Sequence, residues 1–259
     1  MEEVDLKPHR STYWLNPKAK RDDPVRHAAQ EKEICDLYAS ASALHEQGVH
    51  VASTDEKTGI QALERAAPTL PMRPRQVERR EFEYVRHGTQ CLIASFDVAT
   101  GTIMAPTVGA TRNEEDFAEH IRKVIAQAMD ESWIFILDGL NTHFSESLVR
   151  LVAQLESDSG AVIDLGVKGK EGILKNVESR RAFLASSSHR VRFVYTPKHC
   201  SWLNQIEIWF SILSRRALKR ASFGSADELK TALLDFIAYF NRVLAKPFRW
   251  TYTGRPLTT

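Results

Sequence analysis

Three short segments of this 259-residue chain each carry a carboxylate that could take part in chemistry. Asp55 and Asp138 each close a run of residues typical of β-strands, and Glu207 is expected one or two turns into a helix. If the two strands are parallel neighbours in one sheet, Asp55 and Asp138 emerge at the same edge, where open α/β sheets place their chemistry. The three acids are therefore expected to meet at one corner of the molecule.

Carboxylates that converge in this way are suited to hold divalent cations, which offset their mutual repulsion. Mg²⁺ takes one or two protein carboxylates together with phosphate oxygens and several waters. Two such ions roughly 3.5–4 Å apart can activate the attacking oxygen and stabilise the leaving oxygen of an in-line displacement at phosphorus. Asp55, Asp138 and Glu207 therefore predict a Mg²⁺ site for cutting nucleic acid.

Two polar residues near these acids are candidates for supporting roles. His143 follows Asp138 by five residues and could orient a phosphate or water, or cap the following helix. Asn204 precedes Glu207 by three residues on the same predicted helical face. It could hold that carboxylate through a hydrogen bond, or be an ordinary polar residue at the start of a helix.

Basic residues cluster after the first acid and after the third. Such runs are commonly solvated faces, but beside a phosphodiester site we expect them to contact phosphates. These contacts position DNA without reading its sequence and make binding salt-dependent. The expected DNA-binding residues are Arg73, Arg75, Arg79, Arg80, Arg86, Lys198, Arg215, Arg216, Lys219 and Arg220.

Composition limits the class of protein without identifying its function. Charged residues make up 26%, hydrophobic residues 43%, and the net charge is only +2, so any nucleic-acid surface must be local. Three widely spaced cysteines predict reduced, packed thiols, namely Cys35, Cys91 and Cys200. With no long apolar run and an acidic start, the chain is expected to be soluble and cytoplasmic, without membrane contact.

The pattern along the chain predicts alternating strands and helices after a polar arm in the first 30 residues. A proline- and arginine-rich stretch at 67–75 predicts a long functional loop. Capping boxes at Thr111–Glu114 and Ser225–Glu228 predict two helix starts. Strands are expected up to Asp55 and at 90–98, 102–108, 133–137 and 191–195, and helices at 25–47, 111–129, 145–155, from 201 and up to 241.

This order predicts an α/β fold with a ribonuclease H-like, mixed five-stranded sheet flanked by helices, an N-terminal helical arm and a C-terminal helix. In that arrangement the first and fourth strands are adjacent, which places Asp55 beside Asp138. Glu207 borders a predicted buried stripe of Ile206, Phe210, Leu213 and Ala217. We expect residues 1–48 to form the arm and helix and 49–259 the catalytic domain, with an insertion at about 156–190.

The chain resembles transposases of the insertion sequence 630 family, which are related to the mariner elements within the DDE superfamily. The resemblance covers nearly the whole chain in the expected order. It is carried by D-L-K-P-H-R-S-T-Y-W-L-N-P from Asp5, T-D-E-K-T-G-I-Q-A-L from Thr54, L-P-M-R-P from Leu70, Y-V-R-H-G-T from Tyr84, L-D-G-L-N-T-H from Leu137, S-W-L-N-Q-I-E-I-W-F from Ser201 and K-P-F-R-W-T from Lys246.

The resemblance implies a metal-dependent DNA transposase that cleaves element ends and directs the freed 3′-hydroxyl into target DNA, often at a TA dinucleotide. It implies Asp55, Asp138 and Glu207 as metal ligands, Mg²⁺ as the usual ion with Mn²⁺ as a substitute, and a homodimer acting on double-stranded DNA in a bacterial cytoplasm. Two alternatives stay open: a catalytically impaired descendant that binds nucleic acid or a partner, and a ribonuclease H-like, structure-guided nuclease.

The sequence departs from the family pattern in three ways. Helix-turn-helix modules usually precede the D-L-K-P-H-R segment, and their absence here questions how element ends would be recognised. Gly139 stands where the family typically has Asn after the second acid, which could loosen Asp138. Asp138 and Glu207 are about twice as far apart as in mariner-like proteins, and the extra segment could be a basic clamp on DNA or a relic of a decaying element.

Overall fold

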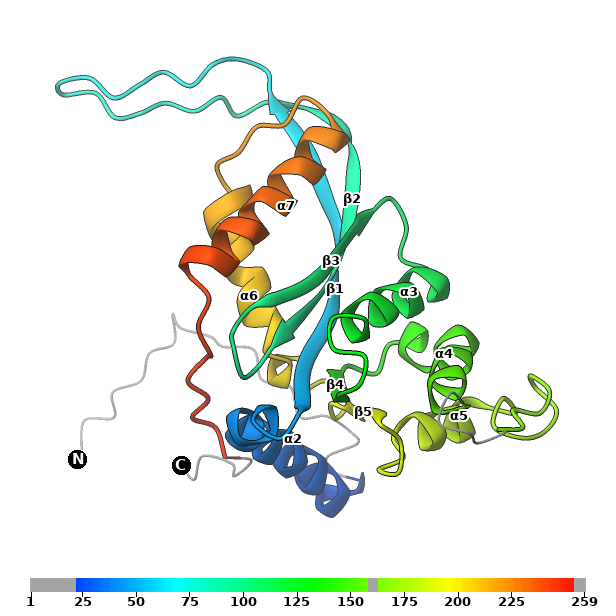
Figure 1. The fold of residues 1–259 in the computed structure, drawn as a ribbon. Helices are drawn as coiled ribbons and strands as arrows, with labels where there is room; N and C mark the ends of the chain where they lie inside the picture. Colours follow the sequence, from blue (N-terminus) through cyan, green and yellow to red (C-terminus); the bar gives the residue numbers. More distant parts are fainter. Residues whose placement is uncertain (1–21, 158–162, 254–259) are drawn as a thin grey trace, which may run out of the picture.

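A mixed β-sheet forms the centre of the molecule. The computed structural model describes residues 22–157 and 163–253, and in that part five strands lie in the order β3-β2-β1-β4-β5 (Figure 1). β2 is antiparallel to β1 and β3, whereas β4 is parallel to β1 and β5. This is the predicted ribonuclease H-like arrangement. The strands are β1 Val49–Arg65, β2 Tyr84–Asp97, β3 Ile103–Gly109, β4 Ser132–Leu137 and β5 Val191–Tyr195.

Helices cover both faces of the sheet (Figure 1). On one face pack α2 Pro24–His45, α6 Ile206–Leu213 and α7 Ala226–Val243; on the other pack α3 Glu114–Ile125, α4 Glu146–Ser157 and α5 Val177–Leu184. Side chains of β4 alternate between the two cores, with Ile134 and Ile136 facing the first and Phe135 and Leu137 the second. The near-continuous apolar run of β4 thus reflects burial on both faces.

β1 is much longer than predicted. It does not end at Asp55 but continues to Arg65, because β2 keeps pairing with it from Asp97 back to Tyr84. Its parallel partner β4 is short and pairs only with Val49–Ser53. Asp55 therefore lies inside a strand, at the place where the neighbour on one side has stopped.

The segment 66–83 between β1 and β2 forms a long arm that projects from the sheet (Figure 1). Isolated bridges join Leu70 to Arg79 and Arg73 to Gln76, so the arm folds back on itself without becoming part of the sheet. The expected long loop is confirmed. Arg65, at the base of the arm, follows Asp55 by ten residues of strand, which at roughly 3.3 Å per residue separates them by about 30 Å.

Several helix boundaries differ from the predictions. The cap of α3 is Asn113, which forms a capping box with Asp116, so the predicted box at Thr111–Glu114 was wrong by two residues. The expected cap of α7 at Ser225 is confirmed. The helix expected from residue 201 begins instead as a 3₁₀ turn at Ser201–Leu203, and α6 starts only at Ile206 and ends in a π-helix at Ser214–Leu218.

Residues 1–21, which are most of the arm predicted for the first 30 residues, lie outside the described part of the chain, and helix α2 already begins at Pro24. Residues 158–162 of the predicted insertion and residues 254–259 also lie outside it. Cys35, Cys91 and Cys200 are free and buried, as expected. Among the described residues, no helix combines the length and apolar character that crossing a membrane requires.

Candidate active site

The structure brings Asp55 and Asp138 together through strand register. The last pair of the parallel β1–β4 ladder is Ser53 with Ile136, and two residues further along the chain lie Asp55, inside β1, and Asp138, just past the end of β4. Since side chains alternate along a strand, both carboxylates point to the face covered by α6. One ligand atom from each of Asp55, Asp138 and His143 lies within 4.8 Å of the other two.

His143 bridges two carboxylates rather than facing open space. Its Nδ1 lies 2.9 Å from Oδ1 of Asp138, and its Nε2 lies 3.2 Å from Oε2 of Glu56. The imidazole is fully buried and packs against the ring of Phe117. The N-terminal cap of α4 comes from Ser145, whose hydroxyl accepts a hydrogen bond from the backbone N–H of Leu148. The structure thus places His143 where it can orient Asp138.

Two hydrogen bonds fix the orientation of the Asp138 carboxylate. Its Oδ1 accepts from the backbone N–H of Leu140 at 2.9 Å and contacts Nδ1 of His143. Within the described residues these contacts all use Oδ1, which leaves Oδ2 for another ligand. A side chain at Gly139 would meet open space, and the carboxylate is held without it. With glycine at this position, Asp138 keeps the backbone N–H of Leu140 and the ring of His143 as partners.

Asn204 contacts Asp55, and not Glu207 as the sequence suggested. Its side chain is fully buried, where Nδ2 donates to the backbone carbonyl of Thr54 at 2.9 Å and to Oδ2 of Asp55 at 3.4 Å. Its Oδ1 accepts from the Ser53 hydroxyl at 2.6 Å. The predicted continuous helix is broken at this position, so Asn204 precedes α6 and faces β1.

Glu207 lies in the first turn of α6, earlier in the helix than predicted. Its residue is exposed, and its backbone N–H donates to the carbonyl of Asn204 at 3.1 Å. It is not part of the group of ligand atoms formed by Asp55, Asp138 and His143. Glu207 therefore follows Asn204, the residue that contacts Asp55, by three positions, and Glu207 is open to solvent.

Burial and the charges of neighbouring groups shift the pKa values of Asp55, Asp138 and His143. Burial, and next the negative charge of Asp138, raise the pKa of Asp55 to about 7. Burial also raises the pKa of Asp138, but the hydrogen bond and charge of His143 outweigh it and leave that pKa below its usual value. Burial lowers the pKa of His143, yet its bonds to Asp138 and Glu56 dominate and raise it to about 10.

This donor set fits a hard divalent cation. Two carboxylates converge at one strand edge, and one of them is kept partly protonated at neutral pH by its surroundings. A cation between them would replace that proton and remove the repulsion that raises the pKa of Asp55. Carboxylate oxygens are ligands that Mg²⁺ and Mn²⁺ accept, so Asp55 and Asp138 are the residues that would hold the metal.

Most of the basic residues predicted to bind DNA lie away from these carboxylates. Those numbered 73 to 80 are exposed on the arm. The exposed residues that follow α6 lead to Ser222 and Phe223, which hydrogen-bond to Arg65 and Leu63 at the base of the arm. Proximity in sequence to Asp55 and Glu207 therefore did not mean proximity in space. The residues of the segment 66–83 are Arg73, Arg75, Arg79 and Arg80, and those after α6 are Arg215, Arg216, Lys219 and Arg220. Arg86 is exposed on β2.

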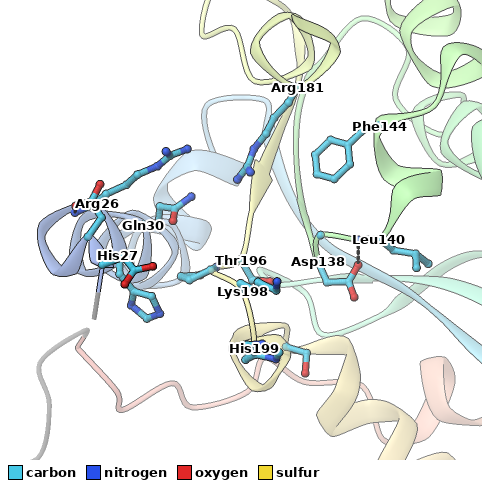
Figure 2. Close-up of a pocket in the computed structure, with 15 residues that line it drawn as sticks. Arg26, His27, Gln30, Asp138, Leu140, Phe144, Arg181, Thr196, Lys198 and His199 are labelled. Atoms are coloured by element: carbon cyan, nitrogen blue, oxygen red, sulfur yellow. Dashed lines mark hydrogen bonds between the residues drawn. The ribbon is translucent and has the colours of Figure 1, made fainter. Parts of the chain in front are cut away.

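Lys198 is the predicted basic residue that does lie near the acids, because it lines a groove of about 700 Å³ that includes Asp138. Figure 2 shows Arg181 entering this groove from α5, with Arg26 and Gln30 of α2 across from it. Sequence reasoning missed Arg26, which lies far from the acidic motifs, and it placed Arg181 only within the extra segment that could form a basic clamp on DNA. It also missed Glu56, although the T-D-E-K segment places this acid directly after Asp55.

Comparison with known proteins gives the family. The sequence model of the DDE superfamily endonuclease family matches residues 50–230, which include Asp55, Asp138 and Glu207. The chain belongs to this family. A comparison with curated proteins found no match.

Solved structures of mariner transposases resemble the chain at low sequence identity. The Mos1 mariner paired end complex with Mn has 13% identity and a TM-score of 0.49, over 92% of this chain and 60% of that one. The catalytic domain of Mos1 mariner transposase has 12% identity and a TM-score of 0.48, over 88% and 85%. The chain thus spans about 60% of the length of the transposase in the paired end complex.

Proposed function

We propose that the protein is a metal-dependent DNA transposase of the insertion sequence 630 group, which is related to mariner. It would cleave element ends and join the freed 3′-hydroxyl to target DNA, with TA as the candidate target dinucleotide. The observation that supports this most is the register match of Asp55 and Asp138 at the end of the parallel β1–β4 pair. We propose that it acts as a homodimer in the bacterial cytoplasm, at the nucleoid when bound to DNA.

In this proposal Asp55, Asp138 and Glu207 hold Mg²⁺, for which Mn²⁺ substitutes. The metal supplies Lewis-acid stabilisation of charge at the phosphate and activation of the attacking oxygen. Asn204 keeps the Asp55 carboxylate against β1, and protonated His143 fixes Asp138 in the orientation set by Leu140. Glu207, which is exposed in the structure, would complete the ligand set from the start of α6.

The test is a reaction of labelled duplexes that carry candidate element ends, with Mg²⁺ or Mn²⁺. We expect the wild-type protein to yield cleaved and joined strands, and Asp138→Asn to yield none. Asp130→Asn is the matched control, because Asp130 is exposed and precedes the same strand. Cleavage without joining would favour a structure-guided nuclease. Binding without any product would favour a descendant that has lost catalysis.

A further inference from the structure

The groove beside Asp138 gathers cationic side chains from three separate parts of the chain. Arg26 comes from α2, Arg181 from α5, and Lys198 from the connection between β5 and α6 (Figure 2). Three acids also line it, namely Asp22 and Asp23 before α2 and Asp138. A divalent cation on Asp138 would therefore shift the balance of charge in the groove to positive.

Arg181 is held in place by aromatic rings. Its guanidinium lies 5.1 Å from the ring centre of Tyr195 and 5.6 Å from that of Phe144. In residues 22–157 and 163–253 its guanidinium forms no ion pair with a carboxylate. The side chain is half-buried, and burial lowers its pKa, with the like charge of Arg26 acting in the same direction. An anion that joined this half-buried guanidinium would offset both its partial desolvation and the like charge of Arg26.

The neighbouring Arg180 shows what a structural arginine looks like in the same helix. Its Nε donates to the carbonyl of Phe144 at 2.6 Å and its guanidinium reaches the carbonyl of Leu174. Arg180 thus uses its donors inside the protein. Arg181 stacks on ring faces instead, which leaves the edge donors of its guanidinium for a ligand.

The geometry points to a binding site for DNA backbone phosphate in this groove, with Arg181 as the principal phosphate ligand and Arg26 and Lys198 as its partners. This inference rests on the proposed function, since Asp138 at the edge of the groove would hold the metal beside the phosphate that is cut. The bound phosphates would be those next to it on the same strand. Arg181 would act as a positioning residue, contributed by the segment that lengthens the spacing between Asp138 and Glu207.

A binding assay tests this without any catalytic readout. The probe is a short dye-labelled oligothymidine with Ca²⁺, which occupies carboxylate sites in place of Mg²⁺. We expect Arg181→Gln to weaken binding by about tenfold or more, since charge-assisted hydrogen bonds are lost. We expect Arg181→Lys to recover part of it, because charge remains without the planar fork. Removing Ca²⁺ should abolish most of the difference between the wild type and Arg181→Gln.

Arg150→Gln is the matched control, since Arg150 is exposed on α4 and paired with Glu146; it should bind like the wild type. If Arg181→Gln melts early because it loses its aromatic contacts, the exposed Arg26→Gln replaces it and should weaken binding severalfold. Wild-type binding by both variants in Ca²⁺ would overturn the inference. If the wild type cleaves DNA and both variants bind like it, the phosphate site fails while the transposase proposal stands. If the variants bind more weakly and the wild type cleaves nothing, the phosphate site stands while the transposase proposal fails.

Discussion

Lowering the pH from 8 to 6 should weaken metal binding at Asp55 and Asp138 by about tenfold. A metal binds the ionised carboxylate, and Asp55 has a pKa of about 7 because it is buried beside Asp138. Roughly nine-tenths of Asp55 is ionised at pH 8 and one-tenth at pH 6, which corresponds to about 1.4 kcal/mol of apparent binding free energy. An Asp with the ordinary value of 3.8 would be ionised throughout this range and would give no change.

Mn²⁺ binding followed by electron paramagnetic resonance at pH 6, 7, 8 and 8.5 measures this effect. Asp55→Asn should bind more weakly and lose the dependence between pH 6 and 8, whereas Glu115→Gln on the exposed face of α3 should match the wild type. An affinity that stays constant from pH 6 to 8 would refute the reasoning. An affinity that keeps rising tenfold per unit above pH 8 would instead identify His143, with its pKa of about 10, as a ligand that must lose a proton.

Three further outcomes follow from the structure. Asn204→Ala removes buried hydrogen bonds to Ser53, Thr54 and Asp55. Urea denaturation should therefore show a free energy of unfolding lower by about 1–3 kcal/mol, and Mn²⁺ affinity should also fall. Unchanged stability would contradict the assigned contacts. Burial lowers the pKa of His120 to about 3. Between pH 6.5 and 3 the unfolded chain therefore binds more protons than the folded protein, and the free energy of unfolding should fall on acidification by up to roughly 4 kcal/mol. Urea denaturation at several pH values should show that His120→Gln lacks this component, and an equal pH dependence in both proteins would argue against it. Four arginines of the segment 66–83, namely Arg73, Arg75, Arg79 and Arg80, can be replaced together with Gln. The slope of log affinity for DNA against log salt should then become shallower by about 0.9 per lost phosphate contact, while Mn²⁺ affinity stays the same. A parallel loss of Mn²⁺ binding would contradict the separation between this segment and the metal site.

The adjacency of Asp55 and Asp138 was predictable because it depends on local patterns. Each acid follows a run of residues typical of β-strands, and equivalent positions of parallel neighbours lie side by side even though β1 continues beyond Asp55. The length of β1 was not predictable from β1 alone, since its second half is set by pairing with β2 across the intervening arm. Strand ends that depend on a distant partner leave little trace in the local sequence.

The contacts of Asn204 and Arg181 could not be predicted from local sequence patterns for a different reason. Periodicity predicted a continuous helix from residue 201, and the 3₁₀ turn before α6 redirects Asn204 from Glu207 to Asp55. Arg181 lies in a helix whose position over Phe144 and Tyr195 is fixed by tertiary packing. Glu56 was overlooked because alternation along a strand places it on the opposite face from Asp55, where His143 nevertheless reaches it.

Crystals soaked in Mn²⁺ and measured at the manganese absorption edge would test the metal site most directly. We expect an anomalous peak in contact with the carboxylates of Asp55 and Asp138, and Glu207 turned inward to coordinate the metal when DNA is bound. The peak should disappear in Asp138→Asn. A map in which manganese occupies other sites while Asp55 and Asp138 remain without metal would contradict the proposed chemistry.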